Sequence, residues 1–587
     1  MFAKNDGHLQ QPLFSTINSL PAKQQQRLKE SWADTFYKEV FCRIPEENLA
    51  ILYSDEASRP NIPVNVLLGL EILKDGYGWT DEEMYNNFCY NVQVRYGLGY
   101  RNLEEGHFEL RTVYNFRGRH TRHMAETGEN LFEICFEQIT DEQMEAFKVK
   151  GGIQRMDSKQ IASNIREMSR LQLLVEVVQR VYRMLSAADK MSYHEVFEPY
   201  IKQKSGRYIY RLKGEVHQPH IEQVGQLLAR LVDELDATYQ DEETYGVLQR
   251  VFEEHFIRVE EEEGVRAKNG DELQADSLQS PDDLEATFRR KRGEGHVGYV
   301  VNVTETADPK NELQLITKVQ TESNTTDDAA MLAEALPDLA QRTEIDTLYT
   351  DGTYSSPAVD DLCCTLGIDQ VQTGIRGAQP AGDKLPLSEF IIVLDKSGTP
   401  CQATCPHGQT VNVTTGRKPN RFLAVFSQSA CLGCADHDRC PTEEKKRQPQ
   451  RTLYFSLEQL NVARRRQRMK QARASGDNLR AAVEATVREI SCRFNKATVR
   501  VRGQSRVSMT LIAAAAMANA RRIWRYQQTK RVKARQESTQ PAGNTQNGSD
   551  MAIGGIKSLL TRLIRHWQHD CAIIRHLPLH RSNLVEV

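Results

Sequence analysis

Apolar residues recur at helical spacing through the first quarter of the chain. Between Pro63 and Gly76 they return every three or four positions, which predicts a helix. Thr80 and Glu83 form a capping-box signature for a second helix, and a third helix is predicted from Leu103 to about Arg117. We therefore expect residues 15–150 to be mostly helical.

The third predicted helix ends in a basic stretch that contains Arg117 and Arg119. Short helices with basic ends, joined by Gly or Pro turns, suit a helix-turn-helix-like reader of DNA. An ordinary helical bundle explains the same periodicity equally well. The pattern alone leaves both interpretations open.

The periodicity changes at Gly151, where the next ten residues have the pattern of a short strand that contains Asp157. Helical spacing returns from Ile165 to about Leu185 and from Ile221 to Phe256. Two further strands, a helix and a last strand then follow. This order predicts a mixed α/β sheet with a large helical insertion after its first strand. The later strands are His296–Thr304, Leu313–Val319 and Ile345–Thr350, and the helix is Thr326–Ala340.

The rest of the chain divides by composition. A Gly/Pro-rich section with several cysteines extends from Gly374 to about Pro449, and the remainder is helical and basic. Ser538–Asp550 has the composition of a flexible linker. The predicted units are 1–150 (helical), 151–374 (core, with an insertion at about 170–290), 375–450 (Cys-rich), 451–535 (basic end of the core) and 536–587 (linker and tail).

Composition excludes some classes of protein. Of the 587 residues, 39% are hydrophobic, which is ordinary for a globular protein, and the apolar run Met509–Ala518 is about half of what spans a bilayer. We expect neither a signal peptide nor a membrane span. The formal net charge of -3 argues against a nucleic-acid binder. However, Lys445–Arg535 carries roughly two dozen basic residues and about four acids, whereas Asp233–Glu285 is strongly acidic and contains the run Glu260–Glu263.

Two acids stand in strand-like contexts. Asp351 ends a predicted strand and precedes Gly352, which would place its carboxylate at the carboxyl edge of a sheet, where α/β folds bind ligands. Asp157 lies within the first strand. Two-metal phosphoryl transfer needs several carboxylates at one point. On local evidence, a plain Asp-Gly turn also explains Asp351, and a role as a turn or cap residue also explains Asp157.

Glu484 lies on a predicted helix. Helical spacing places Arg480, Glu484 and Arg488 along one face. A solvent-exposed ion pair one turn apart accounts for this pattern, and local physics does not reject it.

The sequence resembles the transposases of bacterial insertion sequences that combine an InsH-like helical N-terminal domain with a DDE catalytic core. The resemblance extends from about residue 35 to residue 525. About 190 and 130 residues separate the three acids. The matching segments include Pro63–Leu68, Gly78–Glu83, Met156–Ser158, His296–Val303, Thr350–Tyr354, Arg480–Glu484, Arg502–Gly503 and Ala518–Arg522.

The resemblance implies an α/β ribonuclease-H-like catalytic core with a large helical insertion, together with an all-α N-terminal DNA-binding domain. It implies that Asp157, Asp351 and Glu484 bind two Mg²⁺ or Mn²⁺ ions, for cleavage at transposon ends and strand transfer into target DNA. Arg480 and Arg488 would neutralise phosphates. By analogy, two chains would pair the DNA ends as a homodimer. The protein would act at the bacterial nucleoid in the cytoplasm, with no membrane as a partner.

The glutamate motif departs from the family pattern. It usually continues with an aromatic residue, Gly and Lys, but here Glu484 is followed by Ala485-Thr486-Val487-Arg488-Glu489. Glu489 is therefore a second candidate for the third acid. We prefer Glu484, because Arg480 stands one turn before it.

The cysteines between Cys401 and Cys440 indicate a metal site rather than disulfides, because a large chain without export signals keeps its thiols reduced. We predict a structural zinc site from one cysteine that precedes a Cys-x2-Cys knuckle and one that follows it. Unligated thiols are the other reading, and Cys401 and His407 are substitute ligands. The predicted ligands are Cys405, Cys431, Cys434 and Cys440, and the nearby DNA-binding candidates are Lys445, Lys446 and Arg447.

Two other functions remain open from sequence. A domesticated or inactive transposase would bind DNA without cutting it. A zinc-stabilised transcriptional regulator would have no use for the strands of the catalytic core.

Overall fold

The computed structural model describes residues 1–10, 12, 14–54, 56, 60–212, 217–259, 264–291, 293–374, 382–395, 398–445, 448–474, 479–491 and 498–539. The chain divides into two compact units, Met1–Gln527 and Gln528–Val587. The described part of the second unit is the end of the last helix, which reaches Thr539. The predicted linker and tail therefore lie mostly outside the described residues.

The N-terminal region is mostly helical in its described residues, as predicted. The capping box at Thr80 is confirmed, since its hydroxyl accepts from the Glu83 N–H and the Glu83 carboxylate accepts from the Thr80 N–H. The helices are α1 (Ala22–Lys29), α2 (Trp32–Glu39), α3 (Val64–Tyr77), α4 (Asp81–Tyr90), α5 (Val92–Gly97), α6 (Leu110–Thr127) and α7 (Leu131–Phe147).

The predicted helix from Leu103 to Arg117 is misplaced. Residues before Leu110 form a turn, because the Glu105 carboxylate accepts from the backbone N–H groups of Arg101 and Asn102. The helix α6 starts only at Leu110, continues past Gly118, and ends at Gly128, which has a φ of 76°. Glycine adopts this left-handed backbone without strain.

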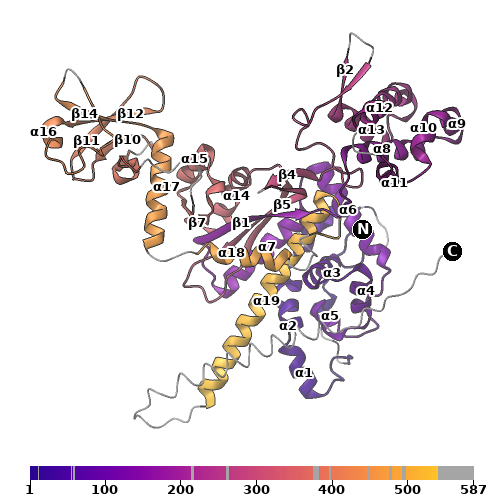
Figure 1. Ribbon diagram of the computed structural model, residues 1–587. Coiled ribbons are helices and arrows are strands. Elements are labelled where there is room, and N and C mark those ends of the chain that lie inside the picture. The colour runs from indigo at the N-terminus through magenta and orange to yellow at the C-terminus, as the bar shows by residue number, and fades with distance from the viewer. Residues whose placement is uncertain are drawn as a thin grey trace. The chain divides into compact units, whose positions relative to one another are not determined.

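A mixed sheet forms the centre of the first unit (Figure 1). Strand β5 (Glu294–Thr306) pairs antiparallel with β1 (Ile153–Ala162) on one side, and with β6 (Ile316–Ser323) and β4 (Thr287–Lys291). On its other side β1 pairs parallel with β7 (Thr347–Thr350), which pairs parallel with β8 (Asp369–Gln372). The prediction of a mixed α/β sheet is confirmed, whereas β4 and β8 were not predicted.

Glycine at position 298 allows β1 and β5 to approach closely. Gly298 has a φ of 143°, and a Cβ there would collide with the backbone carbonyl of Ile161. Two helices pack their apolar sides on the sheet through Met156 and Leu348. They are α14 (Asp328–Thr343), preceding β7, and α15 (Pro357–Leu366), preceding β8.

The predicted insertion between the first two strands has its own hydrophobic core. The stretch Ile221–Phe256 forms two helices, because a turn at Gln240–Glu242 interrupts it and Phe256 begins a strand. The acidic run Glu260–Glu263 lies outside the described residues. The elements are α8 (Arg170–Met184), α9 (Ala187–Ser192), α10 (His194–Ile201), α11 (Ser205–Tyr210), α12 (His217–Tyr239), α13 (Glu243–His255), β2 (Phe256–Val259) and β3 (Gly264–Ala267).

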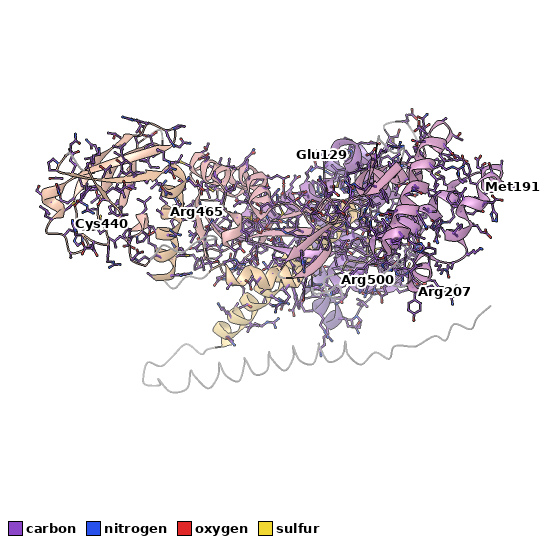
Figure 2. The ribbon with its side chains drawn as sticks, turned by 45° about the horizontal axis from the view of Figure 1, so that its top comes forward. Glu129, Met191, Arg207, Cys440, Arg465 and Arg500 are labelled. Atoms are coloured by element: carbon purple, nitrogen blue, oxygen red, sulfur yellow. The ribbon has the colours of Figure 1, made fainter. Side chains whose placement is uncertain are left out.

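The Cys-rich section forms a second sheet, which is antiparallel and has a separate core. The sequence did not predict this sheet. Its order is β13-β14-β12-β11-β10-β9. Figure 2 labels Cys440 in this section and Arg465 on the helix that follows. The elements are β9 (Ile391–Leu394), β10 (Pro400–Thr404), β11 (Thr410–Thr415), β12 (Arg421–Ser427), α16 (Gln428–Cys431), β13 (Glu443–Glu444), β14 (Gln450–Ser456) and α17 (Leu457–Ala474).

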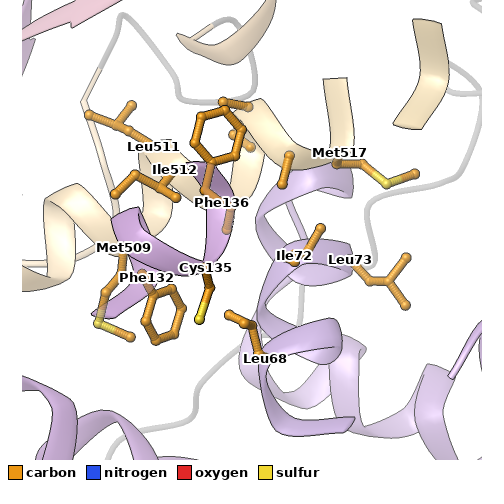
Figure 3. Close-up of a cluster of buried hydrophobic side chains, with 14 of the residues drawn as sticks. Leu68, Ile72, Leu73, Phe132, Cys135, Phe136, Met509, Leu511, Ile512 and Met517 are labelled. Atoms are coloured by element: carbon orange, nitrogen blue, oxygen red, sulfur yellow. The ribbon is translucent and has the colours of Figure 1, made fainter. Parts of the chain in front are cut away.

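Two helices complete the core, α18 (Ala481–Ser491) and α19 (Gln504–Thr539). The apolar run Met509–Ala518 is almost fully buried, in one hydrophobic cluster with residues of α3 and α7 (Figure 3). Met517, for example, lies so close to Gly76 of α3 that a Cβ there would collide with it. This run is therefore a core segment that joins the N-terminal helices to the end of the chain's first unit. No helix among the described residues has the length and apolarity that a bilayer crossing requires.

A buried carboxylate ties α18 and α19 to the sheet. Glu305 of β5 has a fully buried side chain and accepts from Arg155 Nε of β1 at 2.6 Å and from Arg522 Nη1 of α19 at 2.7 Å. Thr486 of α18 donates its hydroxyl to the same carboxylate at 2.7 Å. Arg155 also donates to the carbonyl of Leu479, just before α18. One acid thus fixes four elements.

Replacing Glu305 with Ala is expected to destabilise the core by about 3–5 kcal/mol, because Arg155 and Arg522 would remain largely buried without their counter-charge. Urea unfolding measures the loss, and hydrogen exchange should show faster opening of α18. As a matched control, Asp233→Ala removes a surface pair with Arg258 and should cost less than about 1 kcal/mol. Equal stability of both variants would contradict this role of Glu305.

Candidate active site and cysteine cluster

Asp157 and Asp351 come from neighbouring parallel strands. The register of β1 and β7 pairs Ile153 with Thr347 and Arg155 with Tyr349. Continuing it by two residues sets Asp351 beside Asp157, at the spacing of adjacent strands, about 4.8 Å. Asp351 caps the short 3-10 helix that follows, accepting from the Thr353 N–H at 2.7 Å and from its hydroxyl. The strand geometry therefore brings together two acids that are far apart in sequence.

Glu484 joins them through a shared cation. Arg480 Nη2 lies 3.0 Å from Asp157 Oδ1, and its Nη1 lies 3.4 Å from Glu484 Oε1. The Asp157 side chain is 13% exposed, whereas that of Glu484 is 57% exposed. The Arg480 guanidinium thus lies between a largely buried acid, Asp157, and an exposed acid, Glu484.

Burial and neighbouring charges shift the pKa values of Asp157 and Arg480. Burial raises the pKa of Asp157, Arg480 opposes this, and the charge of Asp351 adds to the rise. For Arg480, burial lowers the pKa, but the carboxylates of Asp157, Asp351 and Glu484 outweigh it, so that the pKa is raised. The Arg480 Nε atom is buried without a hydrogen-bond partner. Three acids therefore surround one incompletely bonded cation.

Glu489, the second candidate for the third acid, lies in different surroundings. Its Oε2 is 3.4 Å from Arg522 Nη2, in the group centred on Glu305. It therefore belongs with the contacts that hold α18 on the sheet, while Glu484 shares a cation with Asp157.

Sequence reasoning missed a fourth acid near the site. Asp328, at the start of α14, is buried and accepts from the Ser158 hydroxyl at 2.8 Å. The fully buried Tyr354 donates to Asn302 at 2.7 Å. Burial raises the pKa of Tyr354, and Asp328, Asp157 and Asp351 add to the rise. Asp328 was not identified from the sequence, because an acid in the first turn of a helix is ordinarily explained by its favourable interaction with the helix dipole.

The predicted DNA-binding residues lie in contrasting environments. Arg117 is 14% exposed and pairs with Glu71 at 2.7 Å and with Asp81 at 2.7 Å, so both acids already neutralise it. Arg119 is exposed and lies over the Tyr53 ring. Arg488 and Lys445 are exposed, and Lys446 and Arg447 lie outside the described residues.

The four predicted zinc ligands line one small cavity of about 30 Å³. Burial raises the pKa of the Cys431 thiol, and its neighbours Cys440, Cys405 and Cys434 raise it further. Two turns present the sulfurs, since Gly408 N–H donates to the Cys405 carbonyl and Cys434 N–H donates to the Cys431 carbonyl.

The substitute ligands make bonds of their own, although His407 lines the same cavity as the four cysteines. The Cys401 thiol donates to the Val393 carbonyl on the neighbouring strand, and His407 Nε2 lies 2.9 Å from Asp436 Oδ2. The chemistry of the thiol set suits zinc, and that of the carboxylate set suits magnesium. In the described part of the chain, no three His, Cys, Asp or Glu side chains are positioned closely enough to hold an ion as they stand.

Comparison with known families identifies one segment. Residues 404–524 match the family model described as a transposase DDE domain. The match includes the four cysteines of the cavity and Glu484, and begins after Asp157 and Asp351. It supports a DDE transposase, and such a domain implies a ribonuclease-H-like fold, in keeping with the mixed sheet. No curated protein and no solved structure matches the chain.

Proposed function

We propose that this chain is a transposase that cleaves DNA at the ends of an insertion sequence and joins the freed 3′ ends to target DNA. The observation that carries the proposal is that Arg480 contacts both Asp157 and Glu484, while the charge of Asp351 also acts on it. The match to a transposase DDE domain over the segment that holds Glu484 supports it independently.

In this proposal Asp157, Asp351 and Glu484 hold a pair of Mg²⁺ or Mn²⁺ ions. Such ions activate the attacking water or 3′-hydroxyl and stabilise the leaving oxygen. The acids fit the group chemically, because hard cations prefer carboxylate oxygens. They also fit electrostatically, because their mutual repulsion is balanced here by one guanidinium, a charge that a bound cation can take over.

The chain's own basic residues would bind and orient the DNA. Arg480 already contacts the acids of the site, and a guanidinium can present two N–H groups to one phosphate. Arg488 is exposed one turn after Glu484. Together they would line the approach to the carboxylates with positive charge. Lys445 is a further candidate for phosphate contact, and Arg117 is left out because its charge is already neutralised.

DNA is the partner that this function requires. We propose that two chains pair the two transposon ends, as the resemblance implies, with the bacterial nucleoid as the site of action. A chain that binds these ends without cutting them is the alternative, and the assay below distinguishes the two.

Asp157→Asn, Asp351→Asn and Glu484→Gln should each lower Mg²⁺- or Mn²⁺-dependent cleavage about 1000-fold, since each removes several kcal/mol of ion binding and charge stabilisation. The assay follows nicking of a plasmid that carries the DNA flanking the coding sequence. Glu489→Gln is the matched control and should retain activity within about tenfold.

Metal-dependent cleavage that survives all three substitutions would refute these assignments. Wild-type binding of the flanking DNA, without cleavage in either metal, would instead favour the DNA-binding alternative. Loss of activity in Glu489→Gln with retention in Glu484→Gln would exchange the two glutamates.

We also infer that Cys405, Cys431, Cys434 and Cys440 bind one structural zinc ion. The inference is supported by their common cavity and by N–H and O–H groups that donate to sulfur, from Gln409 to Cys405 and from Thr442 to Cys440. A site with four protein ligands leaves no open position, so its role would be to brace the second sheet.

The purified protein should contain about one zinc per chain by elemental analysis. Cys434→Ser should lose most of this metal and increase hydrogen exchange in β10–β14, because the knuckle would keep only one thiolate. Cys401→Ser is the control and should keep the metal, since that thiol is bonded to Val393 instead. Metal-free wild-type protein with the same exchange as the variant would exclude the site.

A further inference from the structure

A pocket among the described residues lies away from Asp157, Asp351 and Glu484. It has a volume of about 590 Å³ and is bounded by the α3–α4 turn, by α6, by the extended segment 498–502 and by the start of α19. Pockets for small ligands range from about 300 to 1,000 Å³. It is therefore large enough for a ligand with several rings.

One wall of the pocket is cationic. In the segment Val499–Arg502 the residues alternate, so Val499 is buried while Arg500 and Arg502 are exposed. Arg506, in the first turn of α19, is also exposed and lines the same pocket. Figure 2 labels Arg500. Three guanidinium groups that lie close together in the sequence are a typical arrangement for contact with phosphate.

The acids of the opposite wall do not cancel this charge. Glu71 and Asp81 are paired with Arg117, and Asp75 is paired with Lys74 at 3.4 Å. Arg502 has one acidic neighbour, Asp282 at 3.4 Å, which also pairs with Arg180. The positive charge of Arg500 and Arg506 thus remains available to an anion.

Aromatic residues form the rest of the wall. The Trp79 ring is stacked on Tyr77, with centroids 4.8 Å apart and planes 12° apart, which holds the indole rigidly. Tyr114 also lines the pocket and is 43% exposed, unusually high for a large aromatic residue beside a cavity. Aromatic faces beside cations are the elements that bind unpaired bases of nucleic acids.

The pocket is connected to the strand that carries Asp157. Val499 N–H donates to the Ala162 carbonyl at 3.1 Å, and Asn164 Nδ2 donates to the Arg500 carbonyl at 3.1 Å. Asn164 stands seven residues after Asp157, roughly 20 Å along an extended chain. A DNA strand of a few nucleotides spans that distance.

We propose that this pocket binds one unpaired nucleotide of the DNA substrate, with its phosphate on Arg500 and Arg506 and its base against Trp79 and Tyr114. A paired duplex would meet the arginines by its phosphates alone and would leave the concave aromatic wall unfilled. The inference rests on the proposed function for its ligand class, since DNA is the substrate assumed there.

Binding is measured without added Mg²⁺ or Mn²⁺ and without chelator, with two fluorescent 30-base-pair duplexes that differ only by one unpaired nucleotide. Wild-type protein should bind the duplex with the unpaired nucleotide about tenfold more tightly. Tyr114→Ala should abolish this preference, and Trp79→Phe should retain most of it where Trp79→Ala does not. Arg207→Ala, on the exposed surface of the insertion (Figure 2), is the control and should change neither affinity.

The arginines are tested by salt. Arg500→Ala and Arg506→Ala should each weaken binding and reduce the slope of log affinity against log salt concentration by about 0.7–0.9, whereas Tyr114→Ala should leave the slope unchanged. Free deoxyadenosine and inorganic phosphate, used as competitors, show whether the base or the phosphate alone suffices.

Equal wild-type affinity for the two duplexes, or a preference that survives Tyr114→Ala, would overturn the pocket assignment. Comparing wild-type binding with wild-type cleavage in Mg²⁺ or Mn²⁺ separates this result from the proposed function. An intact preference in wild-type protein that does not cleave would keep the pocket while the enzyme proposal fails, and active cleavage without any preference would do the reverse.

Discussion

The structure depends on one buried charge. The Glu305 carboxylate has no solvent exposure, so its counter-charges must come from the protein, and Arg155 and Arg522 supply them from β1 and α19. With Thr486 bonded to the same carboxylate, α18 has one position on the sheet. Because Arg155 also holds the Leu479 carbonyl, the residue next to Arg480 is fixed as well. The position of the candidate site therefore follows from an interaction that is not part of it.

The carboxylates themselves are brought together by strand register. Parallel pairing of β1 and β7 extends to Arg155 and Tyr349, each two residues before an acid of the site, and two acids at strand spacing repel unless a cation lies near them. Arg480 has this role in the described structure, where it contacts Asp157 and Glu484 together. In such a site an internal cation and external ones compete, because the same carboxylates attract both.

The sequence predicted those parts of the fold that have a local signal. The strand before Asp351 is rich in β-branched and aromatic residues, and the capping box at Thr80 is a local hydrogen-bond pattern. Strand β8 escaped because its buried residues are Gln370 and Gln372, which bond to each other and carry no hydrophobic pattern. Glu305 escaped because an acid in a strand normally faces water, and its partners stand 150 and 217 residues away. Periodicity cannot report such partners, and only the motif resemblance suggested that the three acids belong together.

The N-terminal helices are not a separately tethered DNA reader. Met509–Ala518 of α19 is buried in one cluster with α3 and α7, and Asn519 of the same helix bonds to both backbone groups of Ile316 in β6. A rigid helix that is packed into both regions leaves no room for independent movement, because cores transmit displacement rather than absorb it. Since Arg500 also donates to the Gly78 carbonyl just after α3, DNA held against these helices would be positioned with respect to β1 and hence to Asp157. Recognition and chemistry would then be coupled through packing, with no flexible linker between them.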